Sequence, residues 1–370
     1  MTPLPQSSIM TDYLDEKFKL SHRLQGLANG LGEQIAESLG GSLDLVVGKI
    51  LRLLEEAEQT ESIIRKKKYL EKQKAEIEHV LSEVYAEIGK IIKTTAIEVG
   101  LETPGLLNTI SKRTLKIQLA VPKLDKKTVI SWFEASQVEG LYFNDWLKKL
   151  ESNAVARIIK ESRTALILSG TKTDAVKNIQ NALNVSKRSA RALAQNAVYT
   201  MHNYAELEEY KANSDIISKV RFVAILDRRT TPLCIQLDGQ IFNFNDAPIP
   251  PLHWNCRSSL APVFREERIE RIKGNRIARL DTEARTVHHR DGTTSTVYEK
   301  MRPQTVSDKT TYTEWMKSLI GSKNPADVAF AKEALGPTRF KLVASGKLKL
   351  ESLYYQGKLR SIKQLKELMK

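Results

Sequence analysis

The sequence has few of the features that mark secreted or membrane-spanning proteins. Its 370 residues include only two cysteines, Cys234 and Cys256, so a secreted fold held by disulfides is not expected. No run approaches the ~20 apolar residues of a membrane-spanning helix. The N-terminus lacks a basic segment followed by an apolar one, so no secretory signal is predicted. We therefore expect a protein that is made and assembled in a cytoplasm, without a membrane partner.

The chain also lacks the sequence motifs of common enzymes. It contains no glycine-rich phosphate loop, no G-x-S-x-G nucleophile elbow and no H-E-x-x-H motif. His288 and His289 lie in a polar segment, where solvated side chains are expected. Together these absences predict a protein without enzymatic activity.

Positive charge is in excess. Lys and Arg number 58 against 44 Asp and Glu, a formal net charge of +14. Such an excess favours an acidic partner, namely nucleic acid, an acidic protein surface or anionic lipid. The basic residues are scattered more than clustered, with the densest runs at 65–68, 123–127 and 341–370. Solvated surface lysines therefore explain the excess equally well.

Helical periodicity dominates the first 137 residues. Apolar residues recur every three or four positions over 43–57 and again over 77–92, as on one face of a helix. One extended helix or an antiparallel hairpin would fit this pattern. The stripe could also be a coiled-coil seam that needs a second chain, although we favour a bundle within one chain. Gly100 and the Pro104–Gly105 pair are expected to end the helix.

Helices are also predicted up to residue 212. Pro122 precedes a helix in which Trp132 and Phe133 would be buried. Beyond it the pattern predicts three successive helices: 144–169, one opened by a capping box at 171–174, and one capped by Ser186.

The pattern then changes to short strands. Strands are predicted at 220–226 and 240–244, with Asp238–Gly239 as a hairpin-type turn between them. The prolines at 248, 250 and 251 predict an extended loop. A charged helix is expected over 265–280 and a strand near Val297 and Tyr298. Tail helices are predicted at 312–319, 326–335 and 361–368.

Cys234, His253 and Cys256 are candidate metal ligands, because thiolates and imidazoles bind zinc. Asp227 is the nearest candidate for the fourth ligand, and Asp238 the next. Three other interpretations remain open. The cysteines could form a disulfide, or be small buried apolar side chains beside a His253 that only bonds to a loop carbonyl. A nucleophilic Cys–His pair is less favoured, because nothing marks His253 as an oriented base.

Asp227 has a second, structural interpretation. An Asp at a strand end can accept backbone N–H bonds and fix a turn. Arg257 could then form a bidentate ion pair with Asp227 or Asp238. Such a pair would hold together the two ends of the segment between Asp227 and Arg257 without any catalytic or metal-binding role.

The order of these residues resembles the signature of the phage Mu F-like head morphogenesis family. The matching positions are Asp227, Thr230, Cys234, Gly239, Pro251, His253, Cys256 and Arg257. The resemblance extends over roughly 140–370. Two positions depart from it: Gln195–Asn196 stands where members often carry Arg-Thr, and Ser258 where they often carry another cysteine. The latter excludes a four-cysteine zinc site.

The residue patterns and the resemblance together predict a fold that is mostly α with a small α+β C-terminal module. Long N-terminal helices, as a bundle or a coiled coil, are expected to precede helices packed on a short antiparallel sheet. The expected domains are an N-terminal helical region (1–137) for oligomerisation, portal contact or DNA contact, a Mu F-like core (138–265) and its C-terminal extension (266–370). The implied function is that of a non-catalytic minor capsid protein at the portal vertex of the virion, assembled in the host cytoplasm. Expected partners are the portal protein, the major capsid protein, non-specifically bound DNA and further copies of the chain. The alternative is a virion-carried enzyme or toxin-like effector, and structural zinc is the candidate cofactor.

Overall fold

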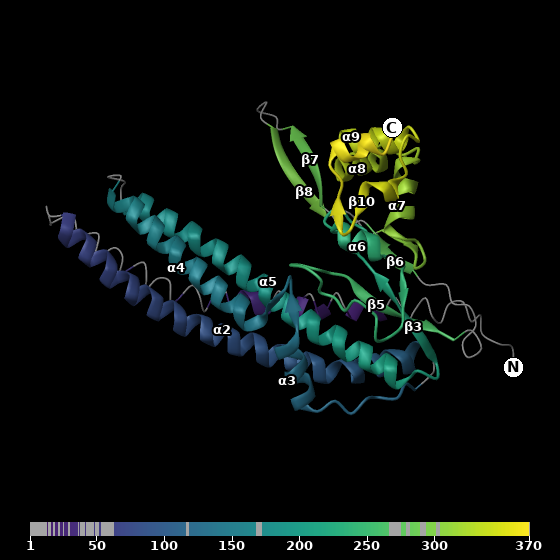
Figure 1. Cartoon of the computed structure of the whole chain (residues 1–370), viewed down its shortest axis with the longest axis horizontal. Helices are drawn as coiled ribbons and strands as arrows, with labels where there is room; N and C mark the ends of the chain where they lie inside the picture. The colour runs from purple at the N-terminus through teal and green to yellow at the C-terminus, as the bar shows by residue number, and fades with distance from the viewer. Residues whose placement is uncertain are drawn as a thin grey trace.

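Three long helices form the largest part of the protein. The computed structural model describes residues 63–115, 118–167, 172–265, 275–278, 282–288, 294–300 and 304–369, together with scattered positions between 13 and 52. The helices are α2 (Ile63–Thr114), α4 (Phe143–Ile167) and α5 (Lys172–Ala212). Figure 1 shows them lying lengthwise side by side, with the C-terminal part standing off the bundle.

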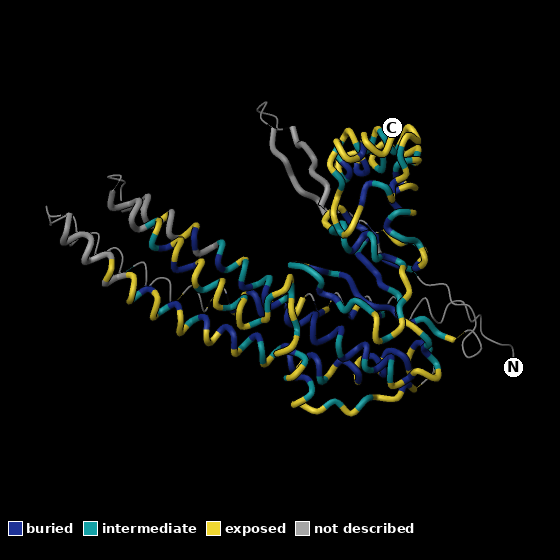
Figure 2. Tube along the Cα trace, in the orientation of Figure 1, coloured by how far each residue is buried: buried dark blue, intermediate teal, exposed yellow. Residues whose placement is uncertain are grey.

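The bundle buries the apolar stripe predicted over 77–92. The buried α2 residues recur every three or four positions, so they lie on one face of the helix. They are Ile77, Leu81, Tyr85, Ile88 and Ile92. They share a core with α5 residues such as Leu193, Val198 and Met201. Figure 2 shows the buried positions running along the facing sides of these helices. The stripe therefore packs within the chain, as favoured, whereas the stripe over 43–57 lies almost entirely outside the described residues.

The expectation that α2 ends at Gly100 or Pro104 is wrong, because the helix continues to Thr114. Pro104 removes one backbone N–H donor from the helix. Tertiary packing outweighs that loss. A Cβ atom at Gly100 would lie 2.8 Å from Cγ1 of Val129 on α3 (Lys126–Ala135) and 3.4 Å from Cβ of Met201 on α5. Glycine thus permits a close approach of three helices, and the contact holds α2 continuous there.

The expectation of three successive helices over 138–212 is also wrong. A two-strand hairpin, β1 (Gln137–Val138) with β2 (Leu141–Tyr142), precedes α4, and α5 then runs unbroken. Ser186 does not cap a new helix. Its buried Oγ donates to the carbonyl of Ala182 within α5, 3.2 Å away, a bond that lets serine sit inside a helix. The predicted end of the first helix at residue 169 and the start of the capping box at Thr171 lie outside the described residues.

A three-stranded antiparallel sheet follows the bundle. Its order is β4-β3-β5, with β3 (Ile217–Val223) in the centre, β4 (Ile241–Phe242) on one side and β5 (Ser259–Phe264) on the other. The two predicted strands do pair, but not through a tight hairpin. A short helix, α6 (Pro232–Leu237), stands between them. It begins with proline, which suits a first helical position, and it carries Cys234.

The C-terminal part combines short strand pairs with small helices. β6 (Asn275–Ala278) pairs with β9 (Gln304–Ser307), and β7 (Thr282–His288) pairs with β8 (Thr294–Lys300). The prediction of a charged helix over 265–280 is therefore wrong for the residues of β6, which form a strand. The predicted strand near Tyr298 and the three tail helices are confirmed, as β8, α7 (Tyr312–Ile320), α8 (Pro325–Leu335) and α10 (Ile362–Glu367).

A second apolar core holds this C-terminal part together. Trp315 and Met316 of α7 pack with Phe330 of α8 and with Leu365 of α10. Other elements here are α9 (Pro337–Ala344), η1 (Leu350–Leu353) and the hairpin of β10 (Tyr354–Tyr355) with β11 (Lys358–Leu359). Along the described part of the chain, no helix combines the length and apolar character needed to cross a membrane.

Candidate functional site

Asp227 and Arg257 join the two ends of the segment that carries the sequence signature. Arg257 donates two hydrogen bonds to the fully buried carboxylate, with N–O distances of 2.5 and 2.9 Å. This confirms the predicted bidentate pair. Burial alone would raise the pKa of Asp227, but the hydrogen bonds and charge of Arg257 outweigh it and lower that pKa.

Asp227 also fixes the turn that follows β3, as predicted. Its Oδ1 accepts a hydrogen bond from the backbone N–H of Arg229 at 3.0 Å and one from Thr230 Oγ1 at 3.2 Å. The Thr230 hydroxyl has one proton, which it shares between Asp227 and the nearer carbonyl of Ile225, 2.5 Å from Oγ1. The carboxylate is thus fully used in structural bonds, and it holds the chain entering α6 in place.

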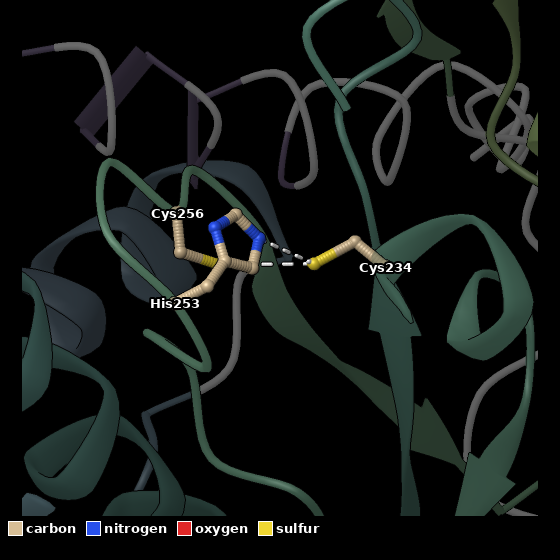
Figure 3. Close-up of side chains that lie close together, drawn as sticks. All are labelled: Cys234, His253 and Cys256. Carbon is tan, nitrogen blue, oxygen red and sulfur yellow. Dashed lines mark hydrogen bonds between the residues drawn. The ribbon is translucent and has the colours of Figure 1, made fainter. Parts of the chain in front are cut away.

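The structure brings Cys234, His253 and Cys256 together (Figure 3). Cys234 lies on α6, and the other two lie on the loop between β4 and β5. A tight turn at Asn255, whose φ is 55°, returns the chain so that the Cys256 N–H donates to the His253 carbonyl at 3.1 Å. The ligand-type atoms of the three side chains all lie within 4.8 Å of one another.

The imidazole of His253 is oriented by bonds on both ring nitrogens. Nδ1 lies 2.9 Å from the backbone carbonyl of Trp254, and only a protonated Nδ1 can bond to that oxygen. Nε2 lies 3.2 Å from Cys234 Sγ and 2.9 Å from Thr231 Oγ1. The second ring nitrogen therefore faces Cys234 Sγ and the Thr231 hydroxyl.

The two thiols differ in acidity because they share a hydrogen bond. The bond from Cys234, together with His253, lowers the pKa of Cys256 well below its ordinary value. The same bond and burial raise the pKa of Cys234. For His253, burial lowers the pKa, but the hydrogen bond and charge of Cys256 outweigh it and raise the pKa. Two sulfur donors and one nitrogen donor thus converge on one point, a donor set that suits a soft metal ion.

The predicted fourth ligand is not part of this group. Among the described residues, the cluster of potential ligands consists of the two cysteines and His253 alone, and Asp227 is bonded to Arg257 instead. Asp238, the second candidate, is bonded to Arg276 at 3.0 Å and to the backbone N–H groups of Ala224 and Tyr312 at 2.7 and 2.6 Å. Both cysteines are free, with their sulfur atoms 3.8 Å apart, so the structure contains no disulfide between them.

The remaining signature residues shape the backbone around the cluster. Gly239 has a φ of +82°, in the region that favours glycine, and lies against the side chain of Thr311. Pro251 is buried, and its peptide bond with Pro250 is cis.

Sequence reasoning missed a buried polar cluster between α5 and the N-terminal helical positions. Lys17 forms an ion pair with Glu206, and His202 Nδ1 lies 3.0 Å from Thr103 Oγ1 of α2. Burial and the charge of Glu206 raise the pKa of Glu209 to about 9. The sequence does carry a signal for this cluster, because residues 202, 206 and 209 follow helical spacing. The stronger apolar pattern of the same helix obscures it.

The chain matches a known protein family. Residues 157–261 match the family model described as Phage Mu protein F like protein. The matched segment runs from the end of α4 through α5, β3, α6 and β4 into β5, and it contains every residue of the sequence signature. No curated protein and no solved structure matched the chain. The resemblance noted in the sequence is thus confirmed over residues 157–261, the part of the chain that is similar to the phage Mu F-like family.

Proposed function

We propose that this protein is a non-catalytic minor component of the phage head, located at the portal vertex of the virion. The match over residues 157–261 carries the proposal. In this region the signature residues hold one another: Arg257 bonds to Asp227, and Cys234 lies against His253. These contacts shape a rigid module, which suits a part of an assembly.

The burial of the two thiols supports a structural role. Cys234 and Cys256 are each 1% exposed, and His253 lies between Thr231 and Cys234. A nucleophilic cysteine needs a thiolate that a substrate can reach. Here a macromolecular substrate would reach neither sulfur without opening the loop.

The long helices are the proposed surfaces for the portal protein, the capsid protein and DNA. On α4, Lys149, Arg157 and Lys160 are exposed and lie within about 80° of one another around the helix at 3.6 residues per turn. Lysine and arginine on one helix face can contact successive phosphates, and such contacts weaken as salt rises.

Purified particles provide the test of the virion role. Mass spectrometry of virions should detect the chain in few copies, and an asymmetric reconstruction should place it at the portal vertex. Detection in immature heads but not in virions would contradict the virion location. Density on the outer shell away from the vertex would contradict the portal location.

A gel-shift salt series tests the DNA contact. The wild-type chain should bind duplex DNA at low salt. The triple variant Lys149→Gln, Arg157→Gln, Lys160→Gln should show a smaller salt slope, by about 0.9 for each phosphate that is no longer neutralised. A matched control neutralises three exposed lysines of the C-terminal part, Lys341, Lys347 and Lys349. Equal effects of both triple variants would contradict a DNA-binding face on α4, and no wild-type binding at low salt would contradict DNA binding altogether.

A further inference from the structure

The Cys234, His253 and Cys256 side chains have the arrangement of a metal site. We propose that they bind one zinc ion. The ion would stabilise the loop between β4 and β5, wherever the protein lies in the virion.

The spacing of the donor atoms carries the proposal. Two thiolates on a tetrahedral zinc, each about 2.3 Å from the ion, are about 3.8 Å apart, and a thiolate and an imidazole nitrogen are about 3.6 Å apart. The two sulfur atoms here are 3.8 Å apart, and Cys234 Sγ lies 3.2 Å from His253 Nε2. A disulfide would need its sulfur atoms at about 2.05 Å. The sulfur pair thus has the spacing of two zinc ligands. The distance from Cys234 Sγ to Nε2 is a few tenths of an ångström below that of a thiolate and an imidazole on zinc, and all three ligand atoms lie within 4.8 Å of one another.

The imidazole is oriented as in a metal ligand. Histidines that bind metals usually donate their other ring N–H to a carbonyl or a carboxylate, which fixes the tautomer. Here Nδ1 bonds to the Trp254 carbonyl at 2.9 Å. This bond leaves the lone pair of Nε2 on the side where Cys234 Sγ and the Thr231 hydroxyl lie.

The surroundings suit two thiolates and one neutral imidazole. Zinc binding would displace the thiol proton of Cys234, and the ion would neutralise the two thiolates that result. Apolar side chains pack around the cysteines, including Leu207, Phe222 and Leu260. They exclude water from the sulfur side, and the half-buried His253 leaves a path for the ion to enter. The fourth position falls to an oxygen donor, and the Thr231 hydroxyl is already bonded to the same Nε2 atom, at 2.9 Å.

Zinc at this point would connect two segments that the sheet alone leaves apart. Cys234 belongs to α6, after the turn that Asp227 fixes. His253 and Cys256 belong to the loop that leads into β5. The ion would therefore act beside the Asp227–Arg257 pair as a second link across the signature segment.

Metal analysis of the full chain tests the proposal. Wild-type protein, purified without chelator and passed through a chelating resin, should retain about one zinc ion per chain, as structural zinc sites do. Cys234→Ser, Cys256→Ser and His253→Gln should each lower the zinc content at least tenfold. His79→Gln is the matched histidine control, because His79 is exposed on α2, and it should retain zinc. Thr231→Val should retain zinc with weaker affinity if the hydroxyl supplies the fourth donor.

Replacing zinc by cobalt in the wild-type chain tests the proposal even if the ligand variants fail to fold. The wild-type chain reconstituted with Co²⁺ should show the visible bands of a tetrahedral site and a thiolate-to-cobalt band in the near ultraviolet. Wild-type protein with a helical circular dichroism spectrum but neither zinc nor these bands would overturn the proposal. Zinc retained at the wild-type level by folded Cys234→Ser and Cys256→Ser variants would overturn it as well.

Discussion

Lys17 and Glu206 form an ion pair in which neither side chain is exposed, with Nζ 3.1 Å from Oε1. Lys17 comes from the helical positions near the N-terminus, and Glu206 lies on α5 within the Mu F-like match. The Lys17 ammonium group also lies 5.7 Å from the centre of the Tyr210 ring. The pair therefore connects a part of the chain outside the family match to the helix at its centre.

Lys17→Met should destabilise the protein strongly. Removing one partner of a buried ion pair leaves the other charge buried without compensation, which costs roughly 3–5 kcal/mol. The free energy of unfolding in urea measures this loss. The double variant Lys17→Met, Glu206→Gln should recover part of it, because no isolated charge then remains.

Lys19→Met is the matched control. Lys19 pairs with Glu16 at 2.7 Å, but its side chain is 60% exposed, so the substitution should change stability little. Equal effects of the two lysine substitutions would contradict a buried pair at Lys17.

Glu209→Gln should change how stability depends on pH. Burial and the charge of Glu206 raise the pKa of Glu209 from 4.5 to about 9 in the folded chain. Between these values the folded state holds a proton that the unfolded state has released. The stability from protonated Glu209 is therefore complete below the unfolded pKa and is lost as pH rises toward 9.

Glutamine stays neutral at every pH, so the advantage of the variant over wild type should grow with pH. The growth should be at most about 1.4 kcal/mol per pH unit between about pH 6 and 8. Taking the difference between two chains cancels most of the titration of the surrounding Lys17, Tyr13 and Tyr210. Glu208→Gln, one position away and half-buried, serves as control. Parallel stability curves for Glu209→Gln and wild type would show that Glu209 is not the group that titrates.

Gly239→Ala should destabilise through two separable effects. A side chain at a φ of +82° costs about 1–2 kcal/mol, and the new Cβ would lie 2.6 Å from Cγ2 of Thr311. Thr311→Ser removes that methyl group and keeps the hydroxyl that caps α7. In the Thr311→Ser background, Gly239→Ala should therefore cost less.

Gly346→Ala isolates the backbone effect, because Gly346 has a φ of +72° and a Cβ added there would meet no atom within 4 Å. A double-mutant cycle measures the contact between the two positions. It compares wild type with Gly239→Ala, Thr311→Ser and the double variant, and the free energies of thermal or urea unfolding give the coupling energy between the two substitutions. Additive effects of the Gly239 and Thr311 substitutions would rule out the contact.

Arg276→Met should loosen the C-terminal part from the sheet. Arg276 is 3% exposed, bonds to both carboxylate oxygens of Asp238 at 3.0 Å and donates to the Ala224 carbonyl. Its loss leaves the Asp238 carboxylate without its cation, at a cost of roughly 3–5 kcal/mol. Limited proteolysis should then cut the C-terminal part faster than in wild type. Arg265→Met, at an exposed position, should leave the cleavage rate unchanged, and a wild-type rate for Arg276→Met would contradict the coupling.

Much of the fold could be predicted because apolar spacing decides it locally. The stripe over 77–92 and the helix beginning near Asn144 required no knowledge of distant contacts. Prediction failed where tertiary contacts outweigh local signals. Glycine and proline usually end helices, so Gly100 and Pro104 predicted a break. The close packing of Gly100 against Met201 keeps α2 continuous. Ser186 has the residue type of a helix cap, but its hydroxyl bonds inside α5.

The candidate site was predicted in part for a similar reason. Cys234, His253 and Cys256 stand out in the sequence, since these residue types are rare in this chain. Asp227 could be paired with Arg257 because both belong to one short segment. The partner of Asp238 could not be found, because Arg276 lies 38 residues further on in a run of charges typical of a helix. The six residues of α6 are too few to show a periodicity.

The core shared by α2 and α5 also limits where recombination between related genes can occur without damage to the fold. Residues of α5 inside the family match, such as Leu193 and Val198, complete one apolar core with α2, which lies outside it. A recombination that exchanged residues 157–261 alone would pair a new α5 with the old α2 and leave mismatched volumes along their whole contact. Selection should therefore favour crossovers before α2, so that both helices are inherited together.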